Sequence, residues 1–225
     1  MKNVANQFNK IAEKYDSQRK DLIPDFDEFY KTAIDSIHLK NSNPIVLEIG
    51  TGTGLLTKMF LEKYPNANMD LVDIAEDMLN IAKERLKGNK NLNFHLENIM
   101  KFNPKEKKKY DAIISSLAIH HLPDLEKQEL YKKIGKWIKT DGIFVNAEII
   151  AGETEYLEKM YQEKDIEILE KANLDSENKK RALDRLNLDI RSPASLQLKW
   201  LKNAGFSHFD CIYKNYSFGI LWAKK

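Results

Sequence analysis

One carboxylate and three glycines lie together at the end of a short apolar segment. Glu48 is the charged residue of segment 45–49, and Gly50, Gly52 and Gly54 follow it at a spacing of two residues. Glycine adopts positive φ readily and lets a ligand approach the backbone closely. A helix that begins after the last glycine would point its free N–H groups and the positive end of its dipole at the same place. The pattern favours a ligand-binding turn at the mouth of a buried strand over an ordinary glycine turn.

A second carboxylate, Asp73, ends the next apolar segment. It follows Gly50 by about 20 residues, near the spacing at which an acidic side chain binds ribose hydroxyls in nucleotide sites. A carboxylate can accept a hydrogen bond from each hydroxyl of a ribose, and the neighbouring Ile74 could lie against a flat adenine ring. The alternative is that Asp73 only caps the helix predicted to begin at Glu76.

Two adjacent histidines, His120 and His121, follow the predicted strand 110–115. Imidazole titrates near neutral pH, so either ring could take a proton from an acceptor. The alternative is a histidine that hydrogen-bonds the backbone and holds the loop. Adjacent histidines do not share a helix face, which argues against a metal pair. Glu148, near the end of strand 143–149, should reach the same edge of the sheet, where it could bind a cationic acceptor, act as a base or simply be solvated.

Strand-like and helix-like segments alternate through the middle of the chain, and this alternation predicts an α/β fold with a doubly wound, mostly parallel sheet. The predicted strands are 45–49, 67–72, 92–96, 110–115 and 143–149, and the predicted helices between them are 55–63, 76–87 and 125–138. The last segments, 206–213 and 216–223, predict an antiparallel hairpin at the end of the sheet.

Length and composition predict a single domain over 1–225. Within it we expect a helical lid at 1–43 and a helical cap insert at 152–202 over the mouth of the sheet. An equal alternative for the insert is a solvated helical spacer. The 36 basic and 34 acidic side chains give a net charge of +2, which favours neither a nucleic-acid nor a membrane surface. The single cysteine excludes an intrachain disulfide and predicts a reducing, cytoplasmic setting. A homodimer is left open.

The glycine turn with its two acids, together with segments 94–102, 110–124, 136–149 and 201–206 in the same order, resembles the class I S-adenosylmethionine (SAM) methyltransferases, in the branch that acts on small molecules. The resemblance implies a seven-stranded Rossmann-like fold and methyl transfer from SAM to a small-molecule acceptor, with S-adenosylhomocysteine as the product. The residues expected to bind the cofactor are Glu48, Gly50, Thr51, Gly52, Gly54, Asp73, Ile74, Met78, Glu97, Asn98, Ile99, Ser115, Leu117, Tyr15 and Arg19. Those expected to act on the acceptor are His121, His120 and Glu148, and no metal ligand is expected.

Some of these roles follow from the resemblance alone. Asn98 stands where the family usually has an acid that contacts the adenine amino group; its carbonyl oxygen could replace that acid, Glu97 could serve instead, or Asn98 could only form a turn. In the N-terminal segment, Tyr15 could stack near the sulfonium and Arg19 could pair with the methionine carboxylate of SAM. The alternative is an amphipathic helix that packs Phe8 and Tyr15 on the core.

Three other functions remain open at this point. A SAM-using enzyme that does not methylate, similar to the carboxy-SAM synthases, would share the cofactor site. A non-catalytic SAM-binding protein would also share it. A nicotinamide oxidoreductase is disfavoured, because the third glycine comes one residue too early for the dinucleotide fingerprint.

Overall fold

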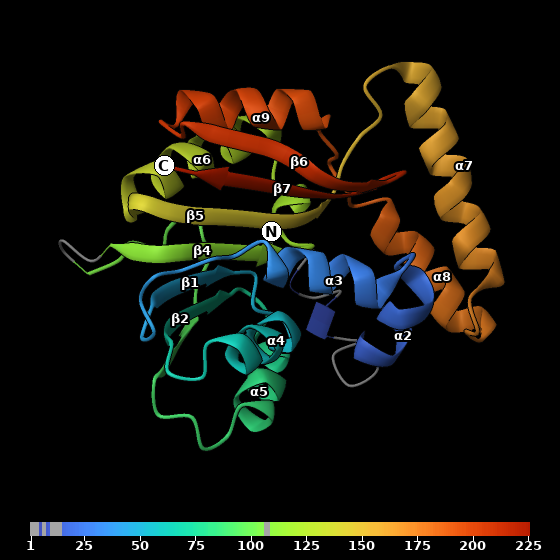
Figure 1. The fold of residues 1–225 in the computed structure, drawn as a ribbon. Helices are drawn as coiled ribbons and strands as arrows, with labels where there is room; N and C mark the ends of the chain where they lie inside the picture. The colour runs from blue at the N-terminus through green and yellow to red at the C-terminus, as the bar shows by residue number, and fades with distance from the viewer. Residues whose placement is uncertain (1–4, 6–7, 10–14, 106–108) are drawn as a thin grey trace.

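The computed structural model describes residues 5, 8–9, 15–105 and 109–225. Their strands form a seven-stranded sheet in the order β3-β2-β1-β4-β5-β7-β6 (Figure 1). Strands β1 to β5 are parallel, while β7 is antiparallel to both β5 and β6. The bounds are β1 Ile45–Ile49, β2 Asn68–Asp73, β3 Leu92–Leu96, β4 Tyr110–Ser116, β5 Ile138–Ile149, β6 His208–Asn215 and β7 Phe218–Lys224. The predicted doubly wound sheet with an antiparallel C-terminal hairpin is confirmed.

Helices cover both faces of this sheet because its central strands are apolar on both sides. In β1, Val46 packs into the cluster that includes helices α3 and α4, whereas Leu47 packs on the opposite face against α6 and α9. The helices are α2 Tyr15–Leu22, α3 Phe26–Asp35, α4 Leu55–Lys63, α5 Glu76–Arg85, α6 Asp124–Trp137, α7 Glu155–Lys171, α8 Ser176–Leu186 and α9 Ala194–Asn203, with a short 3₁₀ turn, η2, at Ile119–His121. Alternating side chains on a buried parallel strand must all find apolar neighbours, which explains the near-continuous hydrophobic sequence of β1.

Several element boundaries differ from the prediction by one to five residues. Strand β2 extends to Asp73 and β4 extends to Ser116, one residue beyond the predicted ends. Strand β5 begins at Ile138 because the expected turn at 140–142 is absorbed as an irregularity within the strand, where Asp141 has a φ of 64° and the pairing with β4 shifts register.

The predicted lid and cap are only partly as expected. Helices α2 and α3 break around Pro24 as predicted, and residues 1–4, 6–7 and 10–14 of the lid segment lie outside the described residues. Helices α7 and α8 stand beyond one end of the sheet, next to α2 (Figure 1). Helix α9, in contrast, buries Trp200 and Leu201 on the face of the sheet beside α6, so this part of the segment 152–202 belongs to the covering layer. Among the described residues, every helix is too short or too polar to cross a lipid bilayer.

Candidate active site

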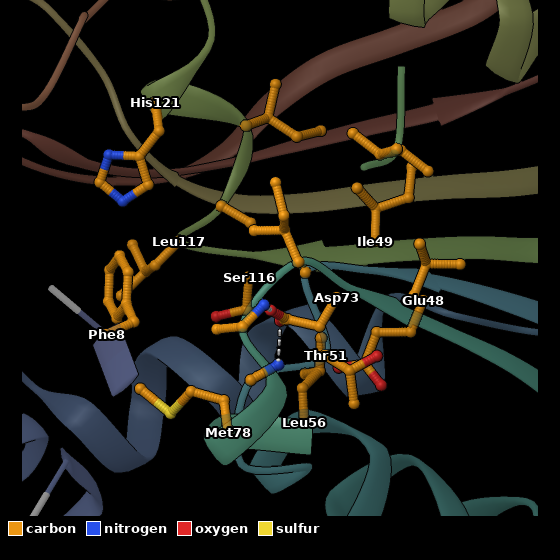
Figure 2. Close-up of a pocket in the computed structure, with 18 of the residues that line it drawn as sticks. Phe8, Glu48, Ile49, Thr51, Leu56, Asp73, Met78, Ser116, Leu117 and His121 are labelled. Carbon is orange, nitrogen blue, oxygen red and sulfur yellow. Dashed lines mark hydrogen bonds between the residues drawn. The ribbon is translucent and has the colours of Figure 1, made fainter. Parts of the chain in front are cut away.

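A cavity of about 840 Å³ opens at the carboxyl ends of β1, β2 and β4 (Figure 2). Strand order reverses here, since β1 has β2 on one side and β4 on the other, and ligands of doubly wound folds bind at such a switch point. Its lining combines apolar surface with a few converging polar groups, as the lining of small-molecule sites does. Predicted site residues that line it are Tyr15, Arg19, Glu48, Gly50, Thr51, Gly52, Asp73, Ile74, Met78, Glu97, Ile99, Leu117 and His121.

The glycine turn shapes the floor of this first cavity. Gly50, Gly52 and Gly54 all have positive φ, at 71°, 54° and 76°. A Cβ on Gly50 would lie 2.2 Å from the Cβ of Ala118, so this position needs glycine both for its φ and for the close approach of the loop after β4. Gly54 is the N-cap of α4 and does not line the cavity itself.

Asp73 joins the two loops that face the ligand. Its Oδ2 accepts a hydrogen bond from the backbone N–H of Gly52 at 2.7 Å, shown in Figure 2, and its Oδ1 accepts one from Ala75 at 2.8 Å. Burial raises the pKa of Asp73, and the backbone N–H groups of Ala75 and Gly52 oppose that shift. Each carboxylate oxygen keeps a lone pair beyond these bonds, so Asp73 can both hold the loops and accept hydroxyl donors from a ligand.

Glu48 supplies a buried acid on the same wall of the cavity. It accepts a hydrogen bond from the hydroxyl of Thr57. Burial raises its pKa to about 8, and the nearby Asp73 adds to this rise, while Thr57 and Arg19 act in the other direction. The side chain is therefore largely protonated at neutral pH, and a cationic ligand in the cavity would stabilise its ionised form.

Helix α2 brings a buried cation to the cavity. The guanidinium carbon of Arg19 lies 4.8 Å from the ring centroid of Tyr15 and 5.4 Å from that of Tyr30, and its Nη2 is 3.4 Å from the hydroxyl of Ser116. Within the described part of the chain, no carboxylate forms a salt bridge with it. A buried guanidinium that faces a cavity in this way is suited to an anionic group of a ligand, such as a carboxylate.

Besides Gly54, two predicted cofactor residues, Asn98 and Ser115, do not line the cavity. The Oδ1 of Asn98 accepts a hydrogen bond from the N–H of Met100 at 2.8 Å, which is the turn-forming alternative, and Asn98 does not line the cavity. Ser115 is fully buried and donates to the carbonyl of Ile49 at 2.9 Å, whereas its neighbour Ser116 lines the cavity. Successive side chains of a strand point to opposite faces, so only one of these two neighbours can face the cavity.

Several apolar side chains also line the cavity, although their sequence pattern did not predict a site there. Phe8 and Tyr15 pack against Ala75 and Met78, as the alternative of an amphipathic helix predicted. All four side chains also line the cavity, so packing on the core and lining the site do not exclude each other here. Apolar residues that line the cavity without having been predicted there are Phe8, Ile49, Leu55, Leu56, Val72, Ala75, Ala118, Ile119 and Leu122. Their hydrophobic type predicts only burial, which gives no signal for a site.

A second cavity, of about 750 Å³, adjoins the first. The residues that line both cavities are Phe8, Tyr15, Arg19, Leu117 and His121. Beyond this shared wall, α7 and α8 contribute mostly apolar side chains, including Leu169 and Leu186. The polar exceptions are His120, Asp165, Arg185 and Asp189.

The two histidines differ in charge. Burial alone would lower the pKa of His120, but the carboxylates of Glu148 and Asp189 outweigh it and raise the pKa to about 9. Burial lowers the pKa of His121 to about 3, helped by the charge on His120, and the opposing effects of Asp189 and the Leu188 backbone are smaller. At neutral pH His120 is therefore cationic and His121 is neutral, with its ring at the junction of the two cavities.

Glu148, the third residue predicted to act on the acceptor, lines neither cavity. Its oxygens accept hydrogen bonds from the backbone N–H groups of His120 and Ile149 at 3.0 and 2.9 Å, and one of them faces the His120 ring. These hydrogen bonds favour a positioning role for Glu148. The catalytic roles of His120, His121 and Glu148 stay predictions.

The fold and the site together define a Rossmann-like ligand-binding domain with a cavity at its switch point. The family described as "Methyltransferase domain" matches residues 46–142. An uncharacterized methyltransferase of Anoxybacillus flavithermus is 32% identical over 153 residues, which are 65% of this chain and 67% of that protein. A malonyl-[acyl-carrier protein] O-methyltransferase of Ilyobacter polytropus is 33% identical over 144 residues, covering 64% of this chain and 52% of the relative.

The chain belongs to the class I SAM-dependent methyltransferases, as the motifs predicted. It spans about half the length of the malonyl-[acyl-carrier protein] methyltransferases that it matches. Among solved structures, a complex of DhpI with S-adenosylhomocysteine superposes with a TM-score of 0.64 at 15% identity, over 98% of this chain and 93% of that one. At this identity the likeness supports the fold alone.

Proposed function

We propose that this protein binds SAM in the first cavity and transfers its methyl group to a small-molecule acceptor in the second. The observation that carries the proposal is the wall that the two cavities share. Methyl transfer proceeds by in-line displacement, so the acceptor must approach the methyl carbon from the side opposite the sulfur. Two adjoining cavities provide this arrangement and keep both reactants in contact range.

The lining of the first cavity matches the parts of SAM. The carboxylate of Asp73 is suited to the ribose hydroxyls, and Ile74, Met78 and Ile99 offer apolar surface for the adenine. Arg19 is suited to the methionine carboxylate, and Glu48 becomes a favourable neighbour for the positive charges of the ligand once it ionises.

The lining of the second cavity indicates a small and mainly apolar acceptor with a hydroxyl, carboxylate or amine at its reactive end. In the reaction, a bond forms between the acceptor atom and the methyl carbon while the carbon–sulfur bond breaks, and its electron pair stays on sulfur. A proton of a hydroxyl or amine would pass to a ring nitrogen of the neutral His121. The transfer converts the sulfonium into an uncharged thioether, which removes a positive charge near His121 and makes its protonation easier.

The test has a binding arm and a turnover arm. Calorimetry should show that S-adenosylhomocysteine binds the full chain and that NADH does not. Methyl-labelled SAM should then transfer its label to one member of a panel of small apolar alcohols, carboxylic acids and amines. Tight binding without transfer to any acceptor would contradict the proposed reaction and favour a SAM-binding protein. A carboxylated SAM among the nucleosides released from the purified protein, detected by mass spectrometry, would favour the carboxy-SAM reading.

A further inference from the structure

Three ligating side chains meet on the wall of the second cavity. His120 and His121 lie in the 3₁₀ turn η2 with their ring centroids 4.0 Å apart, and Asp189 reaches them from the segment after α8. One ligating atom from each of the three residues lies within 4.8 Å of the other two. The Oδ1 of Asp189 is 3.3 Å from the Nε2 of His120 and 3.5 Å from the Nδ1 of His121.

Two of the three distances between ligating atoms are close to those of a metal coordination sphere, and all three lie within 4.8 Å. With bonds of about 2.0–2.1 Å, two ligand atoms of a tetrahedral Zn²⁺ site lie about 3.3–3.4 Å apart. Both measured distances to Asp189 fall near this value. The set of two imidazoles and one carboxylate also leaves a position open, as catalytic zinc sites do.

The surroundings of His120 have the form of a metal site's outer shell. Its Nδ1 faces the Oε1 of Glu148, and its Nε2 faces Asp189 on the other side. An imidazole that binds a metal through one nitrogen usually donates its other N–H to a carboxylate, which holds the ring and its tautomer. Glu148 is in place for that role. Together Glu148 and Asp189 carry the two negative charges that a divalent cation needs for balance.

His121 distinguishes a metal from a simple proton in this cluster. A proton shared on His120 would explain its contacts with both carboxylates and would leave His121 unexplained. Neither ring nitrogen of His121 makes a hydrogen bond of good geometry in the part of the chain that the structure describes, although the side chain is only 6% exposed; its polar neighbours are the Leu188 backbone and, at 3.5 Å, the Oδ1 of Asp189. Buried polar atoms are rarely left in this state. Arg191 stands 4.0 Å from the other oxygen of Asp189 and is itself paired with Asp165 at 2.6 Å.

We infer that His120, His121 and Asp189 form a binding site for a divalent transition-metal ion such as Zn²⁺, with its open position toward the second cavity. Adjacent histidines diverge on a helix, and this spacing argued against a metal pair. In the structure the two rings nevertheless lie with their centroids 4.0 Å apart, and the third ligand comes from a distant segment. With the ion bound, the lone pair of His121 is engaged, and the ion takes over the polarisation of an acceptor oxygen.

The test is metal titration of the tag-free full chain after treatment with a chelator. Calorimetry should show one equivalent of Zn²⁺ bound, and Co²⁺ should give the intense visible absorption of a four-coordinate site. His121→Ala should weaken Zn²⁺ binding by about 100-fold or more, and Glu148→Gln, one step removed, by about 10- to 100-fold. Neither SAM nor an acceptor is needed, so the result is independent of the proposed methyl transfer.

A double variant, His38→Ala with His208→Ala, is the matched control because both histidines are exposed and far from the cluster in sequence. It should bind Zn²⁺ as the parent does. Circular dichroism must show the parent's fold in His121→Ala, and Asp189→Asn serves as a second ligand variant. Absence of Zn²⁺ and Co²⁺ binding in the parent, unchanged binding in both ligand variants, or loss of binding in the control would overturn the inference.

Discussion

Asp73→Asn gives the sharpest test of the cofactor site. Each oxygen of Asp73 already accepts one backbone N–H bond, from Gly52 and Ala75, which leaves one acceptor position per oxygen for a ribose hydroxyl. Asparagine removes the charge and turns one of these acceptors into a donor. The loss of about one charge-assisted hydrogen bond corresponds to about 1–3 kcal/mol, or a roughly 5- to 150-fold weaker affinity for S-adenosylhomocysteine.

Isothermal titration calorimetry measures this change directly, and urea unfolding separates it from a loss of stability. Asp70→Asn is the matched control. Asp70 lies on the same strand, buried, and accepts a hydrogen bond from the hydroxyl of Tyr110 at 2.7 Å, yet it does not line the cavity. This control should lower the free energy of unfolding and leave the affinity unchanged. If Asp73→Asn bound the nucleoside as tightly as the parent, the ribose would have to lie elsewhere.

Three further outcomes are expected. Arg19→Met should weaken S-adenosylhomocysteine binding in calorimetry by about 10-fold or more. The affinity for 5′-methylthioadenosine, which lacks the amino-acid part, should stay unchanged, and equal losses for both ligands would contradict the carboxylate contact. With an acceptor from the screen, His121→Ala should reduce turnover of metal-free enzyme about 100-fold with little change in nucleoside affinity, and unchanged turnover would remove His121 from catalysis. The pKa of His120 is raised from 6.5 to about 9 in the folded state, so its protonated ring stabilises the fold. This contribution to the free energy of unfolding is fully present below about pH 6.5 and is lost as the pH rises through 9. In the presence of chelator, the free energy of unfolding should therefore fall by about 3 kcal/mol over this range, and His120→Gln should lack this decline.

The mostly parallel sheet and the cofactor turn could be predicted because both follow from local sequence patterns. Alternation of apolar strands with amphipathic helices selects a parallel sheet, whose strand ends necessarily meet at one edge. The positive φ of Gly50 and the spacing to Asp73 are likewise local requirements, and the structure places both residues at the cavity. The face toward which a given side chain of β4 points is not fixed by its residue type, and Ser116 rather than Ser115 lines the site.

The sequence by itself determined the family, the sheet and the acids that face the cofactor. Only the tertiary structure decided the acceptor side. The second cavity exists because α2, α7 and α8 pack against one another beyond the strand ends. The two histidines differ in charge because Glu148 and Asp189 converge on His120. Such contacts join residues that are far apart along the chain. Burial and charge shift a pKa only over a few ångströms in space, so the spacing of residues in the sequence cannot predict these shifts.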